Sequence, residues 1–264
     1  MEESKLKADI AENWNAESMY YDSHVSHGIA TEEEKRLWME AFNAVLPKND
    51  NLRILDVGCG TGAMGLILSE MGHEVSGIDL SEGMMEVGRR KAAEHDLSMT
   101  FTEGDAEYPP FSDDTFDVVV NRHLLWTLPH PATALENWFR ITKPGGVVLV
   151  IDGVWDDGSS ITKARRKVSD MLAHRLEAHP HGKRSYSEEV RAALPHNGGV
   201  SPDVVRTYFA ETGLEEVACL DLKQITENQC RQLPWYRKIM KMSSYYLMAG
   251  SKPICIEEEG VQQT

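Results

Sequence analysis

Cysteine is scarce in this sequence, and no hydrophobic run is long enough to cross a membrane. The four cysteines, at positions 59, 219, 230 and 255, are widely separated, without a C-x-x-C pair or a histidine at zinc-finger spacing. We therefore predict reduced thiols. The longest apolar stretches, such as 147–151, are far shorter than the ~20 residues that a membrane helix needs. Because the first residues also lack the basic-then-apolar order of a signal peptide, we expect a cytoplasmic protein.

Basic residues are also in deficit. The sequence has 27 Lys and Arg against 42 Asp and Glu, which gives a formal net charge of -15. Such a chain repels phosphate backbones and anionic lipid surfaces unless one face segregates its Lys and Arg. We therefore expect neither nucleic acid nor a membrane as a partner. With 264 residues, 41% of them hydrophobic, the chain has the composition of an ordinary globular protein.

Residues 51–151 alternate between short β-rich runs and stretches with helical periodicity, which predicts a parallel sheet covered by helices. The Lys-Pro-Gly-Gly sequence at 143–146 predicts a turn. Capping signals predict a helix closed by Gly72, a second that follows Ser81 and a third that starts at Pro131. The expected strands are 53–57, 74–80, 99–103, 116–120 and 147–151.

The segments around this α/β core break the pattern. Residues 1–50 are expected to form a helical cover, with a capping box at Thr31 and Glu34. Residues 152–200 are expected to be an inserted lid or substrate-specificity segment. Residues 201–250 would complete the sheet, with a helix that starts at Ser201 and ends at Gly213 and with strands over 216–222 and 243–249. Residues 251–264 form a polar tail that we expect to be disordered.

The most informative motif is a glycine loop directly after the first strand. Asp56 precedes glycines at 58, 60 and 62, and such glycines let a ligand approach the backbone at a helix N-terminus. The loop also contains a literal G-x-G-x-x-G at 60–65, the fingerprint of dinucleotide-binding folds. However, the turn begins two residues too early for that fingerprint. A pyrophosphate would also lie beside Asp56, where like charges ~4 Å apart repel by roughly 4 kcal/mol.

These residues resemble the first motif of the class I S-adenosylmethionine-dependent methyltransferases, whose cofactor is a sulfonium cation without phosphate. Asp79, the Gly-Asp-Ala-Glu sequence at 104–107 and the Pro-Gly-Gly turn also fit, so the resemblance covers about 51–151. It implies a doubly wound, mostly parallel seven-stranded sheet whose last strand is the antiparallel edge. It also implies S-adenosyl-L-methionine as cofactor and S-adenosyl-L-homocysteine as product.

The resemblance carries specific roles to residues of this chain. Asp79 would accept hydrogen bonds from the ribose hydroxyls, Asp105 would bind the adenine amino group, and the backbone amide of Ala106 would meet the ring. Trp14, by contrast, is assigned to packing. The other residues predicted to bind the cofactor are Tyr21, with Tyr20 as the alternative, Asp56, Gly58, Gly60, Met84 and Asn121, with Arg122 as a further candidate beside it.

The loop after the fourth strand would border the transferred methyl group. Methyl transfer from sulfonium is an in-line displacement that depends mainly on alignment and exclusion of water. Where the acceptor must lose a proton, His123 is the candidate general base, although a packing role for it remains open. The loop and the residues after it are similar to the small-molecule branch that includes ubiquinone and menaquinone methyltransferases.

The segment 163–184 carries seven Lys or Arg and two acids, a net charge of +5. A solvated helix face and a lid that attracts an anionic acceptor are both consistent with this pattern. The histidines at 174, 179 and 181 lack a recognisable zinc-ligand register, so we expect no metal site.

We therefore expect a methyltransferase that acts on a small-molecule acceptor, with the methylated atom left open. Two alternatives remain. A protein or RNA methyltransferase would need a positive groove, for which 163–184 is the candidate. A non-catalytic cofactor-binding subunit would bind S-adenosylmethionine without turnover and expose a large apolar patch.

Overall fold

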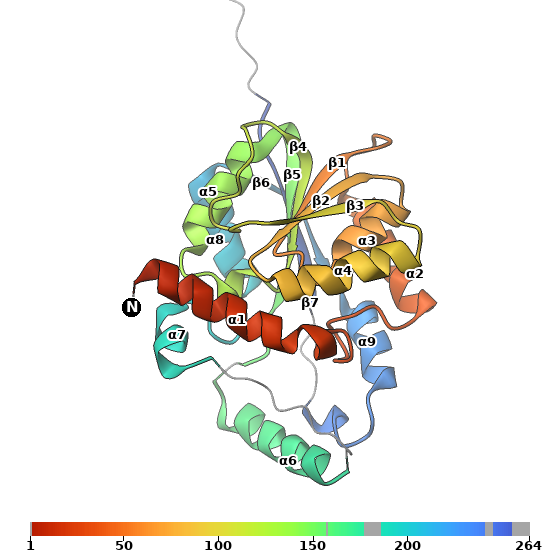
Figure 1. The fold of residues 1–264 in the computed structure, drawn as a ribbon, viewed down its shortest axis with the longest axis vertical. Helices are drawn as coiled ribbons and strands as arrows, with labels where there is room; N and C mark the ends of the chain where they lie inside the picture. The colour runs from red at the N-terminus through yellow and green to blue at the C-terminus, as the bar shows by residue number, and fades with distance from the viewer. Residues whose placement is uncertain (1, 157, 177–185, 241–244, 255–264) are drawn as a thin grey trace, which may run out of the picture.

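The computed structural model describes residues 2–156, 158–176, 186–240 and 245–254. Its centre is a seven-stranded sheet of order β3-β2-β1-β4-β5-β7-β6, with helices on both faces (Figure 1). β1 to β5 are mutually parallel, and β7 runs antiparallel to both of its neighbours. The predicted doubly wound, mostly parallel seven-stranded fold is therefore confirmed. The strands are β1 (Arg53–Val57), β2 (Glu74–Asp79), β3 (Met99–Glu103), β4 (Phe116–Arg122), β5 (Thr142–Gly153), β6 (Glu215–Asp221) and β7 (Tyr245–Ser251).

The prediction that the last strand forms the edge of the sheet is wrong. β7 lies between β5 and β6, and β6 is the edge strand. The physical reason is visible in burial: five consecutive residues of β7, 246–250, are buried, whereas most of β6 is exposed. An apolar strand buried on both faces needs a neighbour on each side to satisfy its backbone hydrogen bonds.

The Pro-Gly-Gly sequence lies inside a strand rather than in a separate turn. β5 begins at Thr142, and its pairing with β4 shifts register between Phe116 and Val118. Gly145 has φ +77° within this irregularity and donates its N–H to the carbonyl of Lys252. The positive φ that glycine allows therefore occurs in a bulge-like distortion at the start of β5 and not in a separate turn.

The predicted capping residues begin and end the helices as expected. Ser81 Oγ accepts from the Met84 N–H, and Thr31 Oγ1 accepts from the Glu34 N–H. Gly213 closes a helix with φ +82°. The α-helices are α1 (Glu3–Tyr21), α2 (Glu32–Val45), α3 (Ala63–Glu70), α4 (Glu82–Glu94), α5 (Pro131–Ile141), α6 (Ser160–Leu176), α7 (Glu188–Ala193), α8 (Pro202–Thr212) and α9 (Lys223–Gln232). The described residues also form the 3₁₀ turns η1 (Leu125–Thr127) and η2 (Lys238–Met240).

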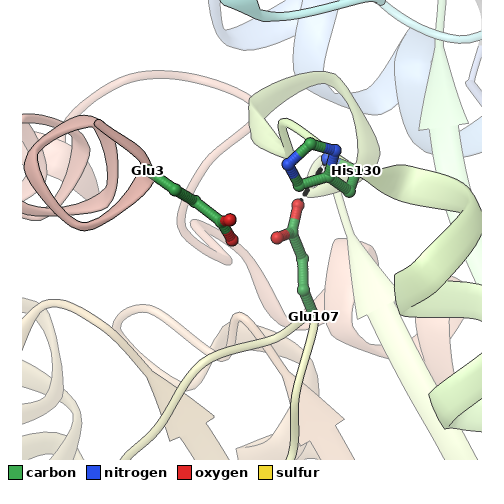
Figure 2. Close-up of side chains that lie close together, drawn as sticks. All are labelled: Glu3, Glu107 and His130. Atoms are coloured by element: carbon green, nitrogen blue, oxygen red, sulfur yellow. Dashed lines mark hydrogen bonds between the residues drawn. The ribbon is translucent and has the colours of Figure 1, made fainter. Parts of the chain in front are cut away.

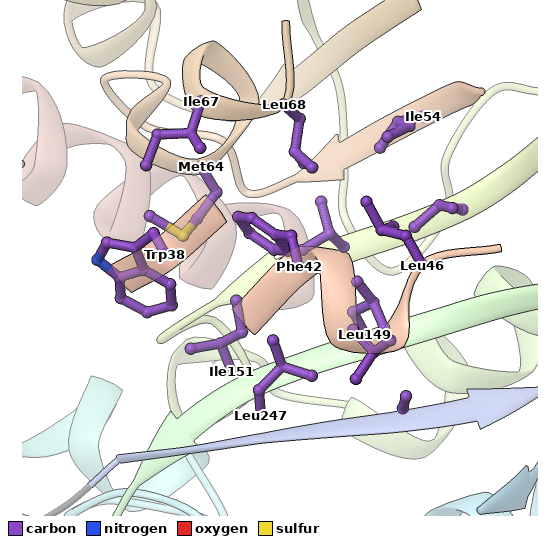
Figure 3. Packing of buried hydrophobic residues seen from close by; sticks show 14 of the residues in the cluster. Trp38, Phe42, Leu46, Ile54, Met64, Ile67, Leu68, Leu149, Ile151 and Leu247 are labelled. Atoms are coloured by element: carbon purple, nitrogen blue, oxygen red, sulfur yellow. The ribbon is translucent and has the colours of Figure 1, made fainter. Parts of the chain in front are cut away.

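A hydrophobic core fills each face of the sheet. On one face, Trp38 and Phe42 of α2 lie together with Met64 of α3 and Leu149 of β5 (Figure 3). On the other face, α5 and α8 supply buried residues such as Trp138 and Phe209. These two layers hold the strand ends, and hence the glycine loop, in fixed positions.

The segments outside the core supply a cover and an insertion. The predicted helical cover contains α1, which packs against α4, and α2. The inserted segment contributes α6, which lies at the lower end of the molecule in Figure 1, and α7. Within the described residues, no helix has the length and apolarity needed to span a membrane. His179, His181, the start of the strand predicted at 243 and most of the polar tail lie outside the described residues.

Candidate functional site

The glycine loop has the backbone conformation that only glycine adopts easily. Gly58, Gly60 and Gly62 have φ of +63°, +51° and +75°, which is the left-handed region. A Cβ at Gly58 would lie 2.5 Å from Leu124 Cδ1. The sequence therefore keeps glycine here because both the turn and the approach of the β4 loop exclude a side chain.

Asp79, at the carboxyl end of β2, is fixed by backbone amides. Its Oδ2 accepts from the Gly60 N–H at 2.8 Å, and its Oδ1 accepts from the Ser81 N–H at 2.8 Å. Burial raises the pKa of the Asp79 carboxyl, although the backbone hydrogen bonds oppose that shift. Because each carboxylate oxygen has a second lone pair, Asp79 can still accept hydrogen bonds from a bound ligand.

Two adjoining cavities lie at this end of the sheet, and Gly58 lines both. The first contains a pair of opposite charges, Asp56 and Arg122. The second contains the strand-end carboxylates. The first cavity is lined by Tyr21, Asp56, Gly58, Cys59, Gly60, Thr61, Ala63, Met64 and Arg122. The second is lined by Lys7, Ile10, Trp14, Gly58, Asp79, Leu80, Asp105, Ala106, Glu107, Leu124, Thr127, Leu128 and Pro129.

Asp56 and Arg122 present incompletely paired charge to the first cavity. Asp56 is buried and accepts one backbone hydrogen bond, from the Gly65 N–H at 2.9 Å. Burial raises the pKa of Asp56 to about 7, although the Gly65 hydrogen bond and the charge of Arg122 lower it. One guanidinium nitrogen of Arg122 donates to the carbonyl of His27, while its buried Nη1 has no hydrogen-bond partner. The cavity can therefore accommodate both a cation and an anion.

In the second cavity, Lys7 of α1 joins the cover to the core. Its Nζ lies 2.8 Å from Asp105 Oδ2, 2.7 Å from Glu107 Oε2 and 2.8 Å from Glu3 Oε1. Burial alone would lower the pKa of Lys7, but these carboxylates raise it above its ordinary value. Asp105 Oδ1 meanwhile accepts from the Glu107 N–H. Both oxygens of Asp105 are thus engaged, each with a lone pair to spare.

Glu3 and His130 approach the same buried carboxylate. Figure 2 shows Glu3, from α1, facing Glu107, whose Oε1 accepts from the His130 N–H at 2.5 Å. Ligand atoms of these three residues lie within 4.8 Å of one another, which is compatible with a metal ion. However, the Lys7 ammonium already forms ion pairs with both carboxylates, so we assign no metal here.

Aromatic rings from separate segments meet beside the second cavity. The centroid of Trp126 lies 6.2 Å from that of Trp14, 5.3 Å from that of Trp155 and 5.9 Å from that of Tyr186. Trp155 in turn lies 6.0 Å from the His123 ring. We call these five residues the aromatic cluster. It extends from α1 through η1 to the segment after β5, and it offers an apolar, ring-lined wall.

His123 is held in this cluster by an unusual backbone. Its φ is +55°, and its ring lies 4.8 Å from that of Tyr245. Burial, and then the charges of Arg122 and His27, lower the pKa of His123 well below its usual 6.5. The buried Nδ1 has no hydrogen-bond partner. His123 is therefore a neutral imidazole that can accept a proton or a hydrogen bond.

The structure brings most of the predicted cofactor residues together, but not all. Tyr21, whose ring stacks on that of His27, and the residues predicted at the glycine loop, β2 and β3 line the two cavities. Met84 instead lies against Gly60, with its Cε 3.1 Å from a Cβ built there, and lines neither cavity. Asn121 is fully buried and donates to the carbonyl of Leu149.

Lys7, Trp155 and Tyr186 are the site residues that the sequence did not indicate. Arg122, which the sequence offered together with Asn121, is distinguished from it by parity along the strand: it points to the opposite face of β4, the face that also carries Asp56 on β1. Nothing in the sequence places Lys7 or Trp155, because both reach the site through tertiary packing. Trp14, assigned to packing, lines the second cavity as well.

This donor set fits S-adenosylmethionine. The cofactor has an amino acid end with one cationic and one anionic group, matching Asp56 and Arg122 in the first cavity. Its ribose and adenine need hydrogen-bond acceptors, which Asp79 and Asp105 offer in the second. A Cβ at Gly58, where the cavities join, would clash with Leu124. No phosphate site is present among the described residues that line the cavities, whose acids outnumber their basic side chains.

Comparison with known proteins agrees with this geometry. Residues 55–150 match the family model described as "Methyltransferase domain". The chain is 32% identical over 149 residues to a demethylmenaquinone methyltransferase of Clavibacter sepedonicus, an alignment that covers 56% of this chain and 60% of that protein. The chain therefore spans less than two thirds of the curated relative that it matches.

Solved structures share the fold at low sequence identity. The [4+2]-cyclase SpnF superposes with a TM-score of 0.63 at 17% identity, covering 93% of this chain and 95% of that chain. A phosphoethanolamine N-methyltransferase of Haemonchus contortus, in complex with S-adenosyl-L-methionine, gives 0.60 at 17%, covering 90% of this chain and 57% of that one. The predicted resemblance is confirmed for the domain at 55–150, which is a class I S-adenosylmethionine-dependent methyltransferase domain.

Proposed function

We propose that this chain transfers the methyl group of S-adenosylmethionine to a small-molecule acceptor. The observation that carries the proposal is the pair of cavities joined at Gly58, one lined by Asp56 and Arg122 and the other by Asp79 and Asp105. This charge pattern matches a nucleoside that bears an amino acid. The curated relatives are named demethylmenaquinone methyltransferase, which supports a small-molecule acceptor.

Each cavity residue has a defined binding task in this proposal. Asp79 accepts hydrogen bonds from the ribose hydroxyls, while Gly60 and Ser81 fix its orientation. Asp105 and the backbone of Ala106 hold the adenine. Asp56 faces the ammonium of the amino acid end, and Arg122 binds its carboxylate. Because the residues that contact the cofactor lie at rigid strand ends, the protein needs little reorganisation when the cofactor binds.

S-adenosylmethionine supplies an activated methyl group on a positively charged sulfur. This chain contributes position and the exclusion of water. The ring of Tyr21, stacked on His27, closes the first cavity, and Trp14 of α1 covers the second. The cover therefore lies where it can shield the reacting atoms from solvent.

The aromatic cluster is the proposed wall of the acceptor site. Its rings favour an acceptor with an apolar ring, because stacked and edge-to-face contacts stabilise such pairs by about 1 kcal/mol each. His123 contributes a neutral imidazole within this wall, which can take the proton of a hydroxyl acceptor. An acceptor such as a thiolate needs no such base.

The decisive experiment is transfer of label from S-adenosylmethionine with a labelled methyl group. We expect purified protein, incubated with a small-molecule extract of its source, to place the label in one extractable compound. Label in protein or RNA alone would contradict the small-molecule acceptor. Cofactor binding without any transfer would identify a non-catalytic subunit instead. Asp79→Ala serves as the matched control, because it removes the ribose contact and leaves the aromatic cluster intact.

A further inference from the structure

α6 presents an apolar face to solvent, unlike a typical surface helix. Ile161, Val168 and Met171 are 65%, 43% and 55% exposed, respectively. Together with exposed Ala164 they occupy positions i, i+7, i+10 and i+3 of the helix, which lie within about 80° of one another at 100° per residue. The opposite side of α6 is the buried one, where Ser169 and Ala173 lie. Ile161, Ala164, Val168 and Met171 therefore form one continuous stripe, and the exposed Leu176 lies about 60° to one side of it.

Basic residues lie on both sides of this stripe, and Arg175 lies in line with it. Within α6 there are five basic residues and one acid, Asp170, a net charge of +4 in a chain of -15. Arg166 is paired with Asp156, and Asp170 with Arg237. Those pairs leave four exposed basic residues for which the described part of the chain shows no ion pair: Lys163, Arg165, Lys167 and Arg175. An acidic protein can approach an anionic surface only where its basic residues are gathered on one face. In this chain α6 gathers them.

We propose that this outward face of α6 docks on the surface of an anionic lipid bilayer. A helix that lies in the membrane interface combines an apolar stripe with flanking Lys and Arg, which contact the acyl boundary and the anionic headgroups respectively. Charge complementarity selects this occupant: the acidic remainder of the protein repels anionic lipid, and the net positive charge of α6 attracts it. A second copy of the chain that docked through the same helix would instead bring its own positively charged α6 against this one, and the two would repel each other.

The position of α6 supports this orientation. Figure 1 shows α6 at one extremity of the molecule, beyond α1 and α7, so the helix can reach a flat surface. Trp235, 66% exposed, precedes the Arg237 that is ion-paired to α6, and tryptophan favours the membrane interface. Arg166 also donates to the carbonyl of Trp155, a member of the aromatic cluster. Docking would therefore hold the proposed acceptor site close to the lipid; this last consequence rests on the proposed function, whereas docking itself does not.

Vesicle co-sedimentation tests the proposal without any methyl donor. The full chain should bind vesicles of phosphatidylcholine with phosphatidylserine and should not bind vesicles of phosphatidylcholine alone. Binding should weaken at high salt, because the attraction is partly electrostatic. Equal binding to both vesicles, or binding to neither, would overturn the proposal.

Two matched pairs of variants locate the surface. Val168→Glu should lower vesicle affinity at least tenfold, whereas Val217→Glu, at a 55% exposed position on the edge strand β6, should not. Lys163→Gln with Lys167→Gln should lower it about twentyfold, whereas Lys223→Gln on α9 should have little effect. The lysine variants lie on an exposed surface, so they test docking even where Val168→Glu disturbs folding.

Gel filtration distinguishes the rival occupant. A dimer that Val168→Glu dissociates, combined with no vesicle binding by the original chain, would show that α6 is an interface between copies and would overturn lipid docking. Failure of docking leaves the labelled-methyl experiment unaffected, so the two proposals fail separately.

Discussion

At the cofactor end of the site, carboxylates are fixed by backbone amides, whereas at the acceptor end aromatic side chains hold one another. Asp79 is bound by the N–H groups of Gly60 and Ser81, and Asp56 by that of Gly65. Trp126, by contrast, is positioned by rings from α1 and from the segments on either side of α6. Backbone geometry is set by the sheet, so the first region tolerates change in its surroundings. The second depends on every segment that contributes a ring.

The largest effect is expected where a backbone-held carboxylate is removed. Asp79→Ala should weaken binding of S-adenosylmethionine about a thousandfold, because two charge-assisted hydrogen bonds of roughly 2 kcal/mol each are lost. Isothermal titration calorimetry measures this directly. Glu103→Ala, at the end of the neighbouring strand β3 and outside both cavities, is the control and should bind normally. Unchanged affinity in Asp79→Ala would remove the ribose assignment.

Lys7 links the cover to the core, so its removal should cost stability. Lys7→Met leaves the buried Glu107 without its cation and should lower the free energy of unfolding by about 3 kcal/mol in urea denaturation. Lys5→Met, at an exposed position on the same helix, should have little effect. Adding Glu107→Gln to Lys7→Met should restore part of the loss. Equal losses in the two lysine variants would show that the ion pairs contribute nothing specific.

Substitution of His123 tests whether this residue takes part in the reaction or only packs against its neighbours. His123→Gln should lower kcat about a hundredfold while cofactor affinity stays the same. Since its pKa is lowered well below 6.5, the imidazole stays neutral as the pH falls, and kcat should not drop through protonation of His123 until the pH is well below 6.5. Turnover by His123→Gln at the original rate would reduce this residue to a packing role.

Substitution of Arg122 distinguishes contacts to the amino acid end of the cofactor from contacts to its nucleoside end. Arg122→Met should weaken S-adenosylmethionine binding about thirtyfold, because a carboxylate contact of roughly 2 kcal/mol is lost. Binding of 5′-methylthioadenosine, which has no amino acid end, should stay unchanged and so controls for damage to the fold. If both ligands lose affinity equally, Arg122 acts through structure rather than through the carboxylate.

Asp56 should make cofactor binding depend on pH. Its pKa is about 7 before the ligand binds, and a cationic group stabilises the ionised form. Affinity should therefore rise about tenfold between about pH 6 and 8 and level off above, with a proton released on binding below about pH 7. Titration in two buffers of different ionisation enthalpy measures the proton. The same pH dependence in Asp56→Asn would assign it to another group.

The core of the fold could be predicted because its signals are local. Ser81, Thr31 and Gly213 cap their helices through contacts within a few residues, and the glycine loop needs positive φ wherever it lies in the fold. The edge strand could not be predicted in this way. Which of β6 and β7 inserts beside β5 depends on burial from both faces of the sheet, and the resemblance suggested the wrong one.

In the candidate site, too, residues placed by local signals could be predicted and residues placed by tertiary packing could not. The resemblance implied Asp79 and Asp105, and both lie at strand ends, where ligands of parallel sheets bind. Lys7, Trp155 and Tyr186 reach the site from helices and loops that are distant in sequence, so no spacing rule finds them. Asn121 and Arg122 were both candidates, and strand parity separates them: neighbouring residues of a strand point to opposite faces of the sheet, and Arg122 lies on the face that carries Asp56.

The place of β7 sets the order in which the sheet can be completed. β6 hydrogen-bonds to no strand except β7 within the described chain, and β7 follows β6 in the sequence, so it is synthesised later. During translation β6 therefore has no strand to pair with until residues 245–251 have left the ribosome. A chain cut just before that point keeps every glycine-loop residue but loses the partner of its outermost strand, and it exposes the bare flank of β5 to other chains.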